Sequence, residues 1–353
     1  MASSHPAKPL IALVLCLLLN SVALAAPQKP DAADACTIPA EIHRDPPIQG
    51  GAPVNVELGI LLIDLSEIDD GDQTFRVDVV VRLRWRDPRL GAKVRGGSFA
   101  DCRLELKDVW NPDIRPLNVR TQHRVLGEAL RVDASGTVVY ERHVQATFAS
   151  RFHLREFPFD VQSLRIQLAS FSYGRGQVRI VPHAFDEVAG REISVAGWRM
   201  LDEHPDAGVG PIKVGPKQFT RVDHVLLVAR EPGYFLWNFV LPLGFIVLMA
   251  WSVFWLDPKA WGPQIGIATA SAFTLVAFLI ALRSRLPPVP YLTRLDELIL
   301  FSTILVFVAL AQVVVTSRFA ETDRLELARR LDAYGRWIYI GALGMVVYMT
   351  LVR

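Results

Sequence analysis

The sequence has 353 residues, of which 51% are hydrophobic, and its formal net charge at pH 7 is only +2. A mean hydropathy of +0.27 is high for a soluble protein, and a near-neutral chain lacks the basic footprint of nucleic-acid binding. Charged residues are nevertheless dense between residues 40 and 230. The composition therefore predicts a polar domain joined to a part that contacts membrane lipid, with no nucleic-acid partner.

The first 26 residues are typical of a secretory signal peptide. Lys8 precedes an apolar run at residues 10–19, and small residues then provide a cleavage site near Ala25 or Ala26. The mature N-terminus is therefore expected outside the cytoplasm.

Two cysteines remain after cleavage, Cys36 and Cys102, because Cys16 leaves with the signal peptide. An oxidising compartment permits a disulfide between them, but two cysteines alone do not establish one.

Residues 27–232 are expected to form an extracellular β-sandwich. Apolar and polar residues alternate with period two at 54–60 and 75–85, and turn signals stand at 69–72 and 133–136. No long amphipathic helix intervenes, and repeated short strands with turns predict an antiparallel sandwich. The further strands are expected at residues 137–147, 161–169, 177–182, 193–200 and 219–229.

Residues 233–353 are expected to form a transmembrane domain of four helices. The apolar segments are residues 234–256, 262–285, 295–317 and 336–352, the last being short for a span. With the N-terminus outside, the linker at 318–335 is cytoplasmic, and its four arginines agree with the positive-inside tendency. The spacing of that linker predicts an amphipathic or continuous helix.

The second apolar segment differs from its neighbours because its first half consists of small and hydroxylated residues. Such residues favour close helix packing or a wet surface over contact with lipid. One side of the helix carries residues spaced alternately by four and three, namely Gly266, Ala270, Phe273, Ala277, Ile280 and Ser284. Several copies of this face around an axis would line a narrow apolar pore. The alternative is a tightly packed buried helix without a pore.

Local motifs support the pore. They are residues 85–90 (WRDPRL), 110–113 (WNPD), 157–162 (FPFDVQ), 241–244 (LPLG) and 286–291 (LPPVPY). In this order and spacing, over residues 50–353, the chain resembles the pentameric ligand-gated ion channels of the Cys-loop receptor superfamily. The resemblance is to the bacterial type, without the cysteines of the signature loop.

The resemblance implies a mainly-β, immunoglobulin-like extracellular sandwich followed by an all-α four-helix transmembrane bundle, assembled as a homopentamer around a central pore. A small-molecule agonist bound between extracellular domains would open the pore to inorganic ions. The expected location is the bacterial inner membrane, with the N-terminal domain on the extracytoplasmic side. A non-conducting ligand-binding receptor and a membrane-anchored binding module remain the alternatives.

The resemblance also places a ligand site on aromatic and charged residues of several loops. These are Trp110, Asp113, Arg115, Phe171, Tyr173 and Phe219. Aromatic faces attract cations, whereas Arg115 favours a carboxylate. The competing interpretation is that the aromatic rings belong to the sandwich core, and for Trp110 the core is favoured. The sequence does not identify the agonist.

The resemblance implies that four residues couple the sandwich to the pore. Asp160 and Arg230 would form a buried ion pair, and Pro158 and Pro287 would lie in the loops that transmit movement. The proline-rich loop 287–290 is expected to lie against residues 157–160.

The residues at the two ends of the pore helix give opposing indications of charge selectivity. No acid precedes the pore helix at 261–264, and Arg283 and Arg285 lie at the outer mouth, which favours anions. Asp257 argues against anion selectivity, because its carboxylate can reach the inner vestibule.

No catalytic constellation is visible in the sequence. The histidines lack metal-binding spacing, and neither a nucleophile elbow nor a phosphate-binding loop occurs. The chain is therefore expected not to be an enzyme and to need no cofactor or metal.

Overall fold

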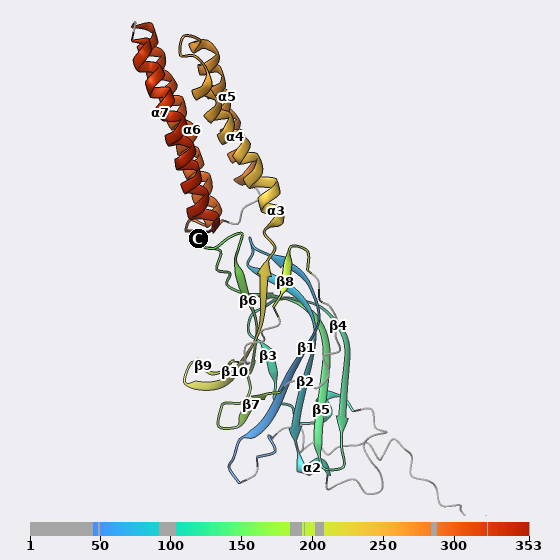
Figure 1. The fold of residues 1–353 in the computed structure, drawn as a ribbon. Coiled ribbons are helices and arrows are strands. Elements are labelled where there is room, and N and C mark those ends of the chain that lie inside the picture. The colour runs from blue at the N-terminus through green and yellow to red at the C-terminus, as the bar shows by residue number, and fades with distance from the viewer. Residues whose placement is uncertain are drawn as a thin grey trace, which may run out of the picture.

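The computed structural model describes residues 45–48, 50–91, 104–183, 193, 195–201, 208–283, 288–322 and 324–352. Two sheets form a sandwich, and helices extend from one end of it (Figure 1). The expected order of a β-domain followed by a helical part is confirmed. Most buried apolar side chains form one cluster that continues from the sandwich into the helices, and Val253, Ala268 and Val313 form a second, small one. The expected signal peptide, Cys36 and Cys102 lie outside the described residues.

The first sheet has five strands in the order β4, β5, β2, β1, β7. Alternation explains β2, in which Phe75, Val77 and Val79 are buried and the residues between them are half-buried. β1 pairs with β7 in parallel, so the prediction of a wholly antiparallel sandwich is wrong at this edge. The bounds are β1 Val54–Asp69, β2 Thr74–Arg86, β4 Val119–Val132, β5 Thr137–Ala149 and β7 Val178–Pro182.

The second sheet has the order β3, β6, β10, β8, and β9 pairs with β10. No strand was expected between residues 200 and 219, but β9 lies there; its glycines, proline and exposed residues give no apolar alternation. The bounds are β3 Ile114–Pro116, β6 Val161–Ser170, β8 Trp198–Met200, β9 Gly208–Val214 and β10 Lys217–Arg230.

Strand β4 was not predicted from the sequence. Among the described strands it lies at the edge of its sheet and pairs only with β5, with three register shifts along the pairing. Nearly all of its side chains are exposed. A strand that buries neither face has no apolar period, so the signal that identifies β2 is missing.

The motif at residues 85–90 closes one end of the first sheet. The buried Asp87 carboxylate accepts hydrogen bonds from Arg89 Nε at 2.8 Å and from Arg89 Nη2 at 2.7 Å. The Asp87 amide donates to Gly136 O at 2.8 Å. Gly136 has φ +81°, and a Cβ there would lie 2.3 Å from Asp87 O, so only glycine fits. Two short helical turns follow, α2 Pro88–Gly91 and η3 Leu106–Asp108.

Three described helical segments are long and apolar enough to cross a membrane, namely Gly233–Trp255, Trp261–Arg283 and Arg294–Glu321. The first combines α3 Gly233–Phe235, η4 Leu236–Val240, α4 Leu241–Ser252 and η5 Val253–Trp255. The second is α5 Trp261–Arg283, and the third is α6 Arg294–Glu321. Thr293 caps α6 by accepting a hydrogen bond from the Asp296 amide.

The last helix is α7 Leu325–Val347, which η6 Tyr348–Val352 extends. It is not among the three apolar segments, because its first half carries charged residues such as Arg329, Asp332 and Arg336. The fourth span therefore stays a prediction. The linker expected at 318–335 is divided between the end of α6 and the start of α7.

Candidate functional site

Arg230, the last residue of β10, is the centre of a charged cluster where the sandwich meets the helices. The predicted ion pair is present, with Arg230 Nε 2.7 Å from Asp160 Oδ1. The sequence did not predict the second partner, Asp70, whose carboxylate accepts from Arg230 Nη1 at 2.8 Å and from Arg230 Nη2 at 2.7 Å. The only sequence signal for Asp70 was its place in the turn after β1. One guanidinium thus bridges two carboxylates from two different loops.

Aromatic rings enclose the same guanidinium. The Arg230 Cζ lies 4.0 Å from the centroid of the Trp198 ring and 4.7 Å from that of Phe157. Burial opposes the charged form, but the hydrogen bonds to Asp70 and Asp160 outweigh it, and the pKa of Arg230 is raised above its ordinary value. The cluster therefore keeps its cation at every physiological pH.

The loop that precedes β6 contacts the start of α6. The Arg294 amide donates to Arg155 O at 3.1 Å, and the Leu295 amide donates to Phe157 O at 3.2 Å. Tyr291 Oη accepts from the Leu154 amide at 3.1 Å. These contacts join residues 154–157 to residues 291–295. Compared with the expected contact of 287–290 with 157–160, the first segment lies slightly earlier in the chain and the second slightly later. Pro287 lies outside the described residues.

The ring of Phe157 also packs edge-on against Phe235, with the ring centroids 4.6 Å apart. Phe235 lies in α3, at the start of the first helical segment. Phe157 is followed directly by Pro158. This loop therefore contacts the first helical segment as well as α6, through residues next to Asp160.

Helix α5 presents two different faces. Of the six expected pore residues, five are exposed, including Phe273 with 76% and Ile280 with 70% of their surface accessible. Ser284 lies outside the described residues. The opposite face is buried and includes Gln264, Ala268, Ser271, Ala272 and Leu275. The described helices of this chain therefore cover the face that was not predicted to line a pore.

The predicted ligand residues Asp113, Arg115 and Phe171 lie together at the edge of the second sheet. Arg115 Nε is 2.6 Å from Asp113 Oδ1, and the Phe171 amide donates to Asp113 O at 3.2 Å. Ser172 Oγ donates to the other carboxylate oxygen of Asp113. The Arg115 charge, which was expected to favour a carboxylate ligand, thus already has an acid beside it.

The remaining predicted ligand residues lie deeper. Trp110 is fully buried and packs on Trp85 and Tyr173, at centroid distances of 6.1 and 5.3 Å. Phe219, at the start of β10, is also buried. The Trp110 ring therefore belongs to the sandwich core, the interpretation that the sequence favoured, and Tyr173 links this core to the exposed Phe171 loop.

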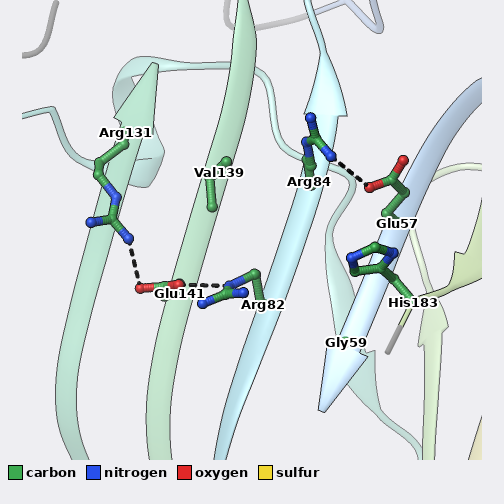
Figure 2. Close-up of a pocket in the computed structure, with 8 residues that line it drawn as sticks. All are labelled: Glu57, Gly59, Arg82, Arg84, Arg131, Val139, Glu141 and His183. Carbon is green, nitrogen blue, oxygen red and sulfur yellow. Dashed lines mark hydrogen bonds and ion pairs between the residues drawn. The ribbon is translucent and has the colours of Figure 1, made fainter. Parts of the chain in front are cut away.

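A polar pocket of about 260 Å³ lies on the first sheet, where β1, β2, β4 and β5 run side by side (Figure 2). Glu141 lies between two arginines, 2.7 Å from Arg82 Nε and 3.0 Å from Arg131 Nη2. Arg84 Nη1 is 3.4 Å from Glu57 Oε2, and His183 lies beside them. The sequence analysis did not predict this pocket. Arg82 and Arg84, two residues apart in β2, point to the same face of the sheet and were the available signal.

Comparison with known proteins agrees with this architecture. The family profile of the neurotransmitter-gated ion-channel ligand binding domain matches residues 41–204. The profile of the neurotransmitter-gated ion-channel transmembrane region matches residues 239–330. The two matches cover the sandwich and the helices in the order in which the structure has them.

The chain is also similar to two channel or receptor proteins over most of its length. A proton-gated ion channel from Gloeobacter violaceus is 28% identical over 273 residues, which are 76% of this chain and 75% of the relative. The human glycine receptor subunit beta is 24% identical over 340 residues, which are 88% of this chain and 68% of that subunit. Such proteins are ion channels and not enzymes. The chain therefore belongs to the neurotransmitter-gated ion-channel family of the Cys-loop receptor superfamily and is a ligand-gated ion channel, with an extracellular ligand-binding domain followed by a transmembrane region.

Proposed function

We propose that the channel is a homopentamer whose pore is lined by α5, at Gly266, Ala270, Phe273, Ala277, Ile280 and Ser284. The observation that carries this proposal is the exposed face of α5, on which Phe273 and Ile280 are 76% and 70% exposed. One chain supplies one such face. A closed ring of identical chains brings these faces together around an axis.

The membrane domain has four spans in this proposal, at about residues 234–256, 262–285, 295–317 and 336–352. In Figure 1, α7 returns from the far end of the bundle, and the C-terminus lies at the junction with the sandwich. This direction supports a fourth crossing. With residues 1–26 removed as a signal peptide, the sandwich of residues 27–232 lies on the extracytoplasmic side of a bacterial inner membrane.

The agonist site lies between neighbouring sandwiches. A ring interface is heterologous, so one surface of a subunit meets a different surface of the next. The Asp113, Arg115 and Phe171 cluster supplies one side, with Tyr173, Trp110 and Phe219 beneath it. The pocket of Figure 2, which lies on the other sheet, supplies the opposing side.

The agonist is a small molecule with an anionic group. Three arginines and two glutamates line the pocket of Figure 2, and the Arg131 side chain is 71% exposed. Carboxylates bind guanidinium groups through charge-assisted hydrogen bonds. Glycine and protons are the first agonists to apply, because one relative is a glycine receptor subunit and another is proton-gated.

Coupling runs from the Arg230 cluster to the helices. Asp160, Pro158 and Phe157 form one loop that contacts both α3 and the start of α6. Movement of this loop is passed to Pro287 and the end of α5.

The pore favours anions. Asp257, which precedes α5 in the chain, is paired with Arg329 of α7 at 3.2 Å, and this pairing offsets its negative charge. Arg283, exposed at the other end of α5, forms a positive ring.

The test is a recording from purified protein in planar bilayers, with glycine, small carboxylates, alkylamines and protons applied in turn. Unitary currents evoked by glycine or a carboxylate would support the proposal, whereas currents evoked only by alkylamines or protons would reject an anionic agonist. Binding of a probe without any current would favour a non-conducting receptor of the same fold.

A further inference from the structure

A polar cluster lies where α7 passes the first turn of α5, towards the end of the bundle far from the sandwich. Gln264 of α5 is completely buried, and Asp332 of α7 is 4% exposed. Gln264 Nε2 lies 3.5 Å from Asp332 Oδ2 and donates to Leu256 O at 3.1 Å. Gln312 and Arg336 also border the Asp332 carboxylate. Side chains of α5, α6 and α7 therefore meet here through polar groups.

This link is not needed to attach α7 to the bundle. Tyr339 Oη donates to Val247 O at 3.2 Å, and Trp251 Nε1 donates to Arg336 O at 3.0 Å. α7 packs chiefly on α6. A buried carboxylate in a membrane helix is costly and marks a functional position by default. The presence of a buried acid at position 332 is therefore better explained by its contact with Gln264 of α5 than by a role in packing α7 onto the bundle.

The neighbouring Gly335 helps to hold the cluster in place. A Cβ at this position would lie 2.2 Å from Gln312 Nε2. The absence of that Cβ lets Gln312 cross the surface of α7 and donate to Leu331 O at 3.0 Å. Gln312 thereby borders Asp332 on the side of α6.

Gln264 stands at the start of the buried face of α5, one turn before Ala268. Gly266 is two residues further on, which is about 200° around the helix. A group that holds Gln264 against α7 therefore turns Gly266 away from the bundle. We propose that Asp332 is a positioning residue, which acts through Gln264 to set the rotation of the first turns of α5. The consequence for conduction, that Gly266 faces the pore axis, rests on the proposed function.

The test uses single cysteines as reporters in the full-length chain, reconstituted in liposomes after Cys16→Ala, Cys36→Ala and Cys102→Ala. Reaction of Ala268→Cys with a charged methanethiosulfonate reagent is followed by intact mass. With Asp332 present, we expect Ala268→Cys to be protected. Asp332→Leu is expected to raise its reaction rate roughly tenfold to a hundredfold, the equilibrium equivalent of one hydrogen bond to a charged group.

Three further variants make the result specific. Asp332→Asn keeps an oxygen acceptor for Gln264 and should preserve most of the protection. Gln264→Met should expose Ala268→Cys as Asp332→Leu does, and the two changes together should add nothing more. Tyr339→Phe, the control, removes another hydrogen bond of α7 and should leave the reaction rate unchanged.

The proposal is overturned if Ala268→Cys stays protected in both Asp332→Leu and Gln264→Met. It is also overturned if Tyr339→Phe exposes the cysteine equally, because α7 would then act only as a general support. If either Asp332→Leu or Gln264→Met does not fold, the reaction rate in the other variant tests the proposal. Gly266→Cys, with Asp332 intact, tests the pore separately. If the cysteine at position 266 is protected from the reagent, the proposed pore face is rejected. The role of Asp332 is still decided by Ala268→Cys.

Discussion

Replacement of Arg230 by alanine tests the charged centre of the junction between the sandwich and the helices. The change leaves two carboxylates close together, since the Asp160 and Asp70 side chains are 1% and 21% exposed and share this one guanidinium. Removing one partner of a buried ion pair costs about 3–5 kcal/mol. Loss of the stacking on Trp198 adds about 0.5–2 kcal/mol. We expect little folded protein and no evoked current.

Graded variants separate the contributions of the two acids. Asp70→Asn should be mild, because the buried partner Asp160 remains to neutralise Arg230. Asp160→Asn should be worse, since it removes the acid that is least accessible to water. Arg230→Lys keeps the charge but loses the planar fork that bridges both acids, so an intermediate effect is expected.

The assay combines size-exclusion profiles and thermal unfolding in detergent with bilayer currents. Arg221→Ala is the matched control, because Arg221 lies on the same strand, 2.9 Å from Asp223, but is 34% exposed. Because Arg221 is partly exposed, its removal should cost less than removal of Arg230, whose side chain is 4% exposed. If Arg230→Ala unfolds and conducts like Arg221→Ala, the argument from burial and pairing is refuted.

The other predictions concern assembly, the gate, the pocket and selectivity. Native mass spectrometry in mild detergent should give a pentamer, and a monomer or dimer would reject the ring. Phe273→Ser should raise resting conductance, because five phenyl rings near the axis can exclude water; an unchanged resting current would mean that the assumed pore face is wrong. Glu141→Gln should alter the apparent affinity for the effective agonist and leave unitary conductance unchanged, whereas equal sensitivity to agonist would remove the pocket of Figure 2 from the site. In a salt gradient, the reversal potential should lie towards the anion equilibrium potential, and reversal at the cation potential would overturn the assignment.

The sequence by itself determined the order of domains and the family. Hydropathy identified the apolar segments because lipid requires long apolar runs, whatever their neighbours are. Short motifs such as residues 85–90 were recognisable because their contacts are local: Asp87 binds Arg89, two residues away. The pairing of Asp160 with Arg230, 70 residues apart, was predicted only through the resemblance.

Only the tertiary structure decided which distant residues meet. Asp70 lies 160 residues from Arg230 in the chain, and nothing in its turn distinguishes it from its acidic neighbours. β4 escaped prediction because it buries no face and depends on β5 for its hydrogen bonds. Gln264 and Asp332 each look like an ordinary polar residue near a helix end until packing buries both. Burial and pairing are properties of the assembled chain, so local pattern cannot supply them.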